Sequence, residues 1–167
     1  MHRKEIVREV MKLCQSQGLV GHEHIVLGII ETESGFNPYS ARYESRYRWL
    51  YKPEDFYREY SSSVETEIVF QKTSIGLMQL MGANYRELGY KPPLPKLFED
   101  WESQLLFGIK FFKRLYERYG NISDAVSAYN QGNPAKREDG SYVNQKYVDT
   151  VLMNAYYFKE DDGVQRT

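Results

Sequence analysis

One glutamate of the sequence stands where it could act as an acid catalyst. Glu33 directly follows an apolar helical run, and Gly35 and Pro38 behind it are ordinary helix stop signals. Loss of hydration at the end of a buried helix raises the pKa of a carboxyl group, and the negative end of the helix dipole acts in the same direction. We therefore expect Glu33 to hold a proton near neutral pH, as a general acid for a glycosidic oxygen must. A solvated glutamate is the commoner alternative at a helix end, and Glu31, which points elsewhere on the helix, is a natural control.

Two more motifs carry polar side chains that could bind a ligand. Gln79 lies in the apolar run 76–81, which reads GLMQLM. A glutamine there must either pair internally or bind a polar ligand, for which an N-acetyl group would be suitable. Tyr129 and Asn130 end a helical segment before Gly132, and they could place a phenol and an amide in the same cleft. Taken singly, each motif is an ordinary core segment or helix end.

Together and in this order, the motifs resemble the catalytic domain of the lytic transglycosylases related to the soluble lytic transglycosylase and goose-type lysozyme. Four blocks carry the resemblance: 33–38 (ESGFNP), 76–89 (beginning GLMQLM), 128–132 (AYNQG) and 146–151 (KYVDTV). The resemblance covers about residues 22–152, which is most of the chain.

This resemblance implies a mainly α, lysozyme-like fold with a groove for a glycan strand. It implies cleavage of the β-1,4 bond between N-acetylmuramic acid and N-acetylglucosamine, in which the muramic 6-hydroxyl attacks its own anomeric carbon and leaves a 1,6-anhydro product. Glu33 matches the catalytic acid, which first protonates the leaving oxygen and then takes the proton from that hydroxyl. The positions that match groove-lining, substrate-binding residues are Ser34, Met78, Gln79, Tyr129, Asn130 and Tyr147.

The number of carboxylates bears on the type of reaction. Hydrolytic glycosidases usually pair two carboxylates, whereas a transglycosylase can use one, because its nucleophile is internal and the N-acetyl group can stabilise the developing cation. A cleft position for Glu44, Glu65 or Glu67 would favour the nearest alternative, a lysozyme-type muramidase. An alternative of another class is a non-catalytic glycan-binding or structural component of a wall-crossing machine.

The pattern of elements predicts a single α-rich domain over 1–167 with a catalytic core at about 22–152. The expected helices cover 3–17, 23–32, 73–81, 82–88, 100–120 (the longest), 123–129 and 142–158. The segment 39–74 is much longer than the family's usual loop. Within it, a short strand or small β-hairpin is expected at 41–51 and a helix start at 52–55, while 64–71 fits a strand or a helix. Residues 42–51 fit either a wall or lid over the groove or a surface embellishment.

Composition narrows the classes of partner. The net charge of −1 gives no electrostatic reason to expect nucleic acid or an anionic membrane surface. Aromatic residues make up 15% of the chain, and tyrosines can stack on sugar rings. No run is long enough to span a membrane, and the N-terminus fits an amphipathic helix better than a signal peptide. The resemblance implies action at the bacterial cell wall or periplasm, and the lack of a visible signal peptide then leads us to expect a phage-borne protein, a protein delivered by a dedicated apparatus, or a trimmed form of a longer chain.

No cofactor and no metal are expected. His22 and His24 diverge on a helix and have no third ligand at suitable spacing. Cys14 is the only cysteine and fits a buried apolar position. The sequence does not predict an oligomeric state.

Overall fold

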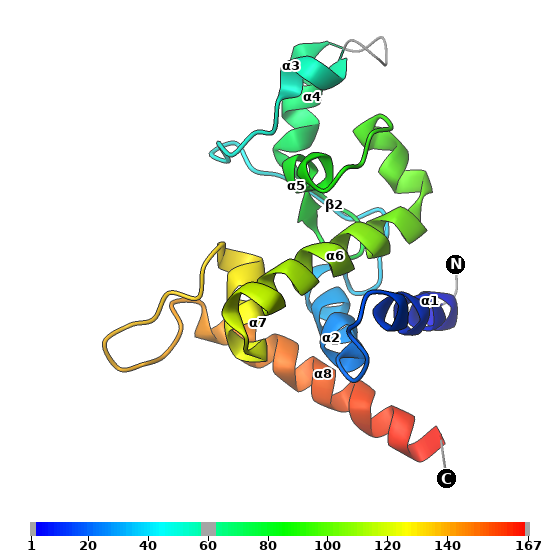
Figure 1. Cartoon of the computed structure of the whole chain (residues 1–167), viewed down its shortest axis with the longest axis vertical. Coiled ribbons are helices and arrows are strands. Elements are labelled where there is room, and N and C mark those ends of the chain that lie inside the picture. Colours follow the sequence, from blue (N-terminus) through cyan, green and yellow to red (C-terminus); the bar gives the residue numbers. More distant parts are fainter. Residues whose placement is uncertain (1–2, 58–62, 166–167) are drawn as a thin grey trace. The chain divides into compact units, whose positions relative to one another are not determined.

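The computed structural model describes residues 3–57 and 63–165, with side chains described to residue 160. The chain forms two compact units. Met1–Gly35 and Ile109–Thr167 make up the terminal unit, and Phe36–Gly108 make up the central unit. Helices hold 63% of the residues, so the prediction of a mainly α, lysozyme-like fold is confirmed (Figure 1). One domain over 1–167 stays a prediction.

Five helices build the terminal unit: α1 (Arg3–Ser16), α2 (Glu23–Ser34), the second half of α6 (Trp101–Tyr119), α7 (Ile122–Gln131) and α8 (Gln145–Gln165). The middle of α2 is buried on every side, which is typical of a helix at the centre of a core. It ends at Gly35, whose left-handed backbone (φ 58°) lets its N–H bond to the Glu31 carbonyl. The predicted helices at 3–17, 23–32 and 123–129 are therefore confirmed to within a few residues.

Most of the short elements belong to the central unit. They are β1 (Ala41–Tyr43), α3 (Pro53–Phe56), α4 (Val64–Gln71), β2 (Thr73–Ile75), β3 (Leu80–Met81), α5 (Gly82–Glu87) and the 3-10 helix η2 (Leu94–Glu99), followed by the first half of α6. The three strands form one antiparallel sheet in the order β1-β2-β3. The expected strand near 41–51 is present, but its partner is β2 and not a neighbouring segment. The segment 64–71, left open between strand and helix, is the helix α4.

The predicted helix at 73–81 is wrong, because this segment is a β-hairpin. Gly76 and Gln79 adopt positive φ values of 85° and 50°, which a right-handed helix does not contain. The buried side chain of Gln104 accepts a hydrogen bond from the Leu77 N–H at 2.9 Å, and it fills the space beside Gly76 that a Cβ would occupy. A tertiary contact thus overrides the apolar pattern.

Two other boundaries differ from expectation. The longest helix is α8, with 21 residues against 19 for α6. It begins at Gln145, because Tyr142 is paired with Lys136 in a β-bridge before the helix. The helix start expected at 52–55 is the four-residue α3, and residues 58–62 lie outside the described residues.

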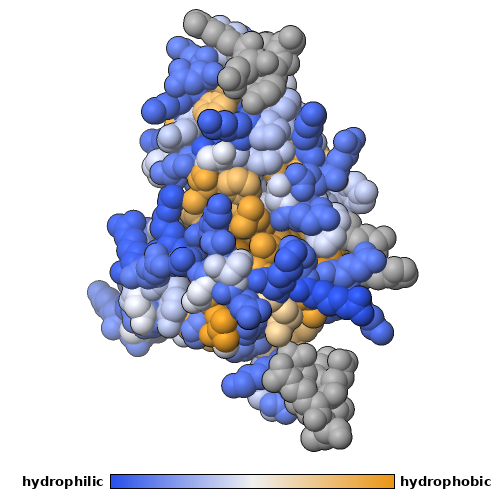
Figure 2. All heavy atoms as spheres, turned by 45° about the vertical axis from the view of Figure 1, so that its right-hand side comes forward, coloured by the Kyte–Doolittle hydropathy of each residue, from blue (hydrophilic) through white to orange (hydrophobic). Residues whose placement is uncertain are grey.

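Hydrophilic side chains cover much of the face shown in Figure 2, with hydrophobic patches between them. Large hydrophobic side chains that stay exposed include Trp49 in the central unit and Tyr156 and Tyr157 in the terminal unit. No helix in the described ranges combines the length and the apolar character needed to cross a membrane.

Candidate functional site

The terminal unit holds the side chain of Glu33 in a defined position. Glu33 lies on the last turn of α2 and is partly exposed. The hydroxyl of Tyr147, in the first turns of α8, donates a hydrogen bond of 2.7 Å to Oε1 of Glu33. A carboxyl group that is both held and partly exposed can reach a ligand without first losing side-chain freedom.

The Tyr147 phenol stays protonated over a wide pH range. Burial raises the pKa of Tyr147 well above its ordinary value of 10.0, and the negative charge of Glu33, their hydrogen bond and nearby Tyr129 raise it further. Tyr129 is itself 9% exposed and packs edge-to-face against Phe111, with ring centroids 5.5 Å apart. The phenol of Tyr147 is therefore a fixed donor toward the carboxyl group.

Close packing of α2 against α8 sets this geometry. A Cβ on Gly28 would lie 2.6 Å from the Val151 carbonyl oxygen, so only glycine allows the two backbones to approach this closely. One turn further along α2, Thr32 Oγ1 accepts a 3.0 Å hydrogen bond from the amide of Asn154. Tyr147, Val151 and Asn154 recur at helical spacing, so one face of α8 makes all three contacts.

Asn130 is held by a short chain of hydrogen bonds in the same unit. The hydroxyl of buried Ser127 donates to Oδ1 of Asn144 at 2.7 Å. The amide of Asn144 then donates to the Ser127 carbonyl and to Oδ1 of Asn130, both at 3.0 Å. Because Oδ1 of Asn130 accepts this bond and the residue is exposed, its amide NH2 group is able to donate to a ligand.

Two predicted substrate-binding residues, Met78 and Gln79, belong to the central unit. Met78 is fully buried and packs against Gly108. The Gln79 amide donates to the carbonyls of Ser40 and Gly76, both at 2.9 Å, and its Oε1 accepts from the Ser74 hydroxyl at 2.9 Å. Internal pairing of this glutamine, one of the two alternatives, is thus present, and contact of either residue with substrate stays a prediction.

Ser34, the other predicted residue at the end of α2, is partly exposed. Its hydroxyl donates to the Ile30 carbonyl at 3.2 Å, one turn back in the helix. The terminal unit therefore contains five of the seven predicted site residues: Glu33, Ser34, Tyr129, Asn130 and Tyr147. Sequence reasoning missed Asn144 and Ser127, because neither lies in a recognisable block and only the fold brings them to Asn130.

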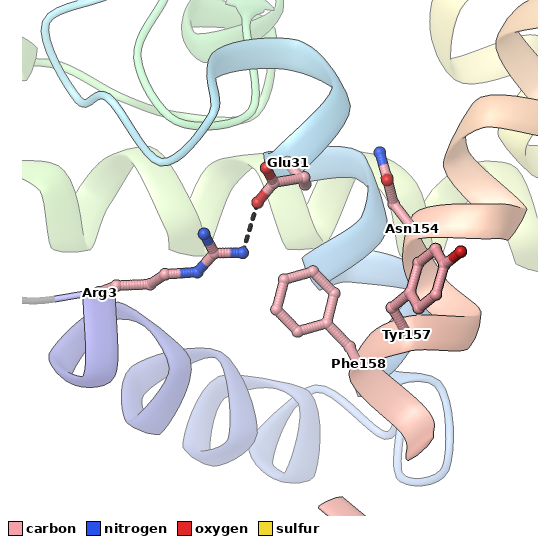
Figure 3. A pocket seen from close by; sticks show the side chains of 5 residues that line it. All are labelled: Arg3, Glu31, Asn154, Tyr157 and Phe158. Carbon is pink, nitrogen blue, oxygen red and sulfur yellow. Dashed lines mark hydrogen bonds and ion pairs between the residues drawn. The ribbon is translucent and has the colours of Figure 1, made fainter. Parts of the chain in front are cut away.

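Glu31 points away from Tyr147, as expected for the control position. It forms an ion pair of 2.5 Å with Arg3, whose guanidinium lies 5.3 Å from the centre of the Phe158 ring. These three side chains, with Asn154 and Tyr157, line a hollow of about 200 Å³ (Figure 3). Because both side chains of the pair are partly exposed, opening it would cost little free energy.

The two histidines near the start of α2 have separate surroundings. His22 packs edge-on against Tyr116, with ring centroids 5.0 Å apart. Burial lowers the pKa of His24, and the positive charges of Lys159 and His22 add to this effect. Within 3–57 and 63–160, no three histidine, cysteine or acidic side chains come together as metal ligands would.

The fold and the held carboxyl group place the chain among lysozyme-like domains. A family model described as the transglycosylase SLT domain matches residues 16–151. The chain therefore belongs to the transglycosylase SLT domain family, as the motifs predict. Membership supports peptidoglycan lytic transglycosylase activity, and with it a glycan substrate and action at the cell wall. No curated protein and no solved structure matches the chain significantly.

Proposed function

We propose that this protein cleaves the β-1,4 bond between N-acetylmuramic acid and N-acetylglucosamine in peptidoglycan and releases a 1,6-anhydro product, with Glu33 as its single acid/base. The observation that carries the proposal is the hydrogen bond from Tyr147 to Glu33. It singles out one carboxyl group, partly exposed at the end of a buried helix, in a chain of the transglycosylase SLT domain family.

The proposed reaction has two proton transfers at the same carboxyl group. Protonated Glu33 gives its proton to the bridging oxygen while the bond from that oxygen to the muramic C1 breaks. The sugar's N-acetyl group stabilises the positive charge that develops at C1. The 6-hydroxyl oxygen then bonds to C1 and gives its proton to ionised Glu33, which restores the acid. No water is consumed, so the two products together have the composition of the substrate.

Tyr147 has a positioning role in this scheme. Its hydroxyl keeps one carboxyl oxygen fixed, and a hydrogen bond to the ionised form is stronger than one to the neutral form. We further propose that Ser34, Tyr129 and Asn130 contact the sugars, with the Asn130 amide as a donor to a substrate oxygen. The prediction that Met78 and Gln79 bind substrate is kept apart from this proposal, because Met78 is fully buried and Gln79 is paired internally.

The competing hydrolytic mechanism needs a second carboxylate. Of the three acids considered for it, Glu67 is buried, and Nε and Nη2 of Arg86 donate to its two carboxyl oxygens at 2.7 and 2.9 Å. Glu44 pairs with Arg42 at 2.7 Å. Glu65 is exposed. The buried pair of Glu67 and Arg86 makes one of the three candidates unsuitable as a second catalytic carboxylate, which supports a single-carboxylate reaction.

Product analysis with matched variants tests the proposal. Glu33→Gln keeps the size of the side chain but cannot cycle a proton, so we expect loss of cleavage by at least about a thousandfold with glycan binding retained. Glu31→Gln, two residues away, should cleave at nearly the wild-type rate. Mass spectrometry of digested sacculi should show anhydro-muropeptides.

Two outcomes would contradict the proposal. Reducing ends in place of anhydro ends would indicate a muramidase. Full lytic activity of Glu33→Gln would show that Glu33 does not take part in the reaction.

A further inference from the structure

The segment 39–51, which we call the arginine–aromatic loop, exposes large aromatic and cationic side chains together. Trp49 is 71% exposed, Tyr39 68% and Tyr43 55%, and Arg46 and Arg48 are exposed as well. Indole is largely apolar, so a tryptophan this open to water loses free energy that binding could recover. Several large exposed aromatic side chains on one short segment are a feature of binding surfaces.

Both ends of the central part of this loop are fixed. Lys72 Nζ donates to the Ser45 carbonyl at 3.0 Å, and the Lys72 carbonyl accepts from the Glu44 N–H at 2.8 Å. At the other end, the side chain of Gln71 accepts from the Tyr51 N–H at 2.7 Å and donates to the Tyr51 carbonyl at 2.9 Å. Residues 46–50 are thus presented between two anchors.

The anchor at Gln71 rests on a buried network. Gln71 also donates to Glu67 at 2.9 Å, and Glu67 in turn accepts from Arg86. The Arg86 guanidinium lies 4.3 Å from the centre of the Phe56 ring, and its Nη1 donates to three backbone carbonyls. A loop on such a support loses less conformational entropy on binding than a free one.

Between the anchors, side chains take two directions. Tyr47 turns inward and is half-buried, and Trp49 packs edge-to-face on it with ring centroids 5.6 Å apart. The ion pairs of the described residues include Arg42 with Glu44 but neither Arg46 nor Arg48. This part of the chain is locally cationic although the whole chain has a net charge of −1. The loop is therefore suited to a ligand that carries both flat apolar faces and negative charge.

We infer that the arginine–aromatic loop binds the peptide-bearing glycan strand, with Trp49 stacked on a sugar ring and Arg46 and Arg48 paired with carboxylates of the stem peptides. The inference rests on the proposed function, since it takes peptidoglycan as the ligand. Peptidoglycan offers both features that the loop matches, because pyranose rings have apolar faces and stem peptides end in carboxylates. A glycan without carboxylates, such as chitin, offers only the first.

Binding to two insoluble glycans, one with stem peptides and one without charge, tests this assignment. In the Glu33→Gln background, which is expected to leave the wall intact, binding is measured by co-sedimentation with sacculi and with chitin, a β-1,4-linked N-acetylglucosamine polymer that has no carboxylates. Arg46→Gln/Arg48→Gln should weaken binding to sacculi about five- to tenfold and leave binding to chitin unchanged. Trp49→Ala should weaken binding to both by at least about fivefold.

Matched controls separate a local effect from a change in net charge. Arg8→Gln/Arg118→Gln removes two exposed cations from the terminal unit, and Tyr156→Ala removes an aromatic side chain that is 59% exposed. Both should bind like the parent.

Three results would overturn the inference. They are unchanged binding of the loop variants, an equal loss of binding by the arginine pair on sacculi and on chitin, and an equal loss by the control pair. None of these would affect the product analysis of Glu33, so this inference and the proposed function can fail independently.

Discussion

Replacing Gly28 by alanine should loosen the helix crossing that positions Glu33. The added Cβ would lie 2.6 Å from the Val151 carbonyl oxygen and 2.9 Å from the Ala155 nitrogen. Both contacts are with backbone, which no side-chain rotation can relieve. Raising the shorter distance to an ordinary 3.4 Å separates α2 from α8 by about 0.8 Å.

The sign of the change in stability shows whether helix propensity or overpacking determines the effect of this substitution. Alanine is favoured over glycine inside a helix by about 1 kcal/mol, so helix propensity alone predicts stabilisation. Overpacking of a close contact costs about 1–3 kcal/mol, and the upper part of this range applies where backbone must move. We expect a net loss of about 1–2 kcal/mol in the free energy of unfolding, measured by urea denaturation, and a fall in melting temperature of roughly 2–8 °C.

The cleavage rate should fall even under conditions in which the variant is still folded. A 0.8 Å shift of α8 would stretch the 2.7 Å bond from Tyr147 to Glu33 beyond hydrogen-bonding distance. We expect a ten- to hundredfold loss of the cleavage rate at a temperature where the variant is still folded. Adding Ala155→Gly should not restore either quantity, because the backbone contacts remain. Stabilisation by Gly28→Ala, or rescue by the second change, would refute the reasoning.

Three further predictions concern single side chains. Tyr147→Phe removes a hydrogen bond to a carboxyl group and should slow cleavage about ten- to hundredfold with little change in folding, measured by product release from sacculi and circular dichroism. Asn144→Ala releases the amide of Asn130 and should raise KM severalfold while kcat changes less, with Asn144→Gln giving no rescue because of its length. Burial raises the pKa of the Cys14 thiol from 9.0 to about 12, so native protein should resist alkylation at pH 8 and react once unfolded. The stability that depends on this neutral thiol is complete below about pH 9 and is lost as the pH rises toward 12, measurable as a falling urea midpoint.

Most of what could be predicted of the fold and the candidate site came from helical periodicity and the four short blocks. The apolar spacing of α1, α2, α6 and α7 gives their positions to within a few residues, because each helix buries one continuous face or is buried throughout. The block that contains Glu33 also contains Gly35, which is a helix stop signal. It therefore marks the end of α2. Tyr147, identified only through the resemblance, proves to be hydrogen-bonded to Glu33 across 114 residues of sequence.

The rest depended on contacts that no local pattern encodes. The segment 73–81 has the apolar composition of a helix, but a glutamine 27 residues further along the chain, Gln104, bonds its backbone and fixes a turn. The buried pair of Glu67 and Arg86 joins residues 19 apart in sequence, and from sequence alone both resemble surface charges. Asn144 is similar, because its bonds to Ser127 and Asn130 exist only once α7 and α8 are packed.

A phenol beside the proposed catalytic carboxyl group suits a residue that, in the proposed reaction, acts as an acid and then as a base. A second carboxylate in that place would repel ionised Glu33 and oppose the state needed for the second proton transfer. A lysine would hold Glu33 ionised and oppose the first transfer. The hydroxyl of Tyr147 carries no charge, and burial together with Glu33 keeps its own pKa well above the working range, so it can donate to Glu33 in both protonation states without losing its own proton. The hydrogen bond therefore fixes the position of Glu33 throughout the proposed cycle, and this is why its loss in Tyr147→Phe should slow both half-reactions.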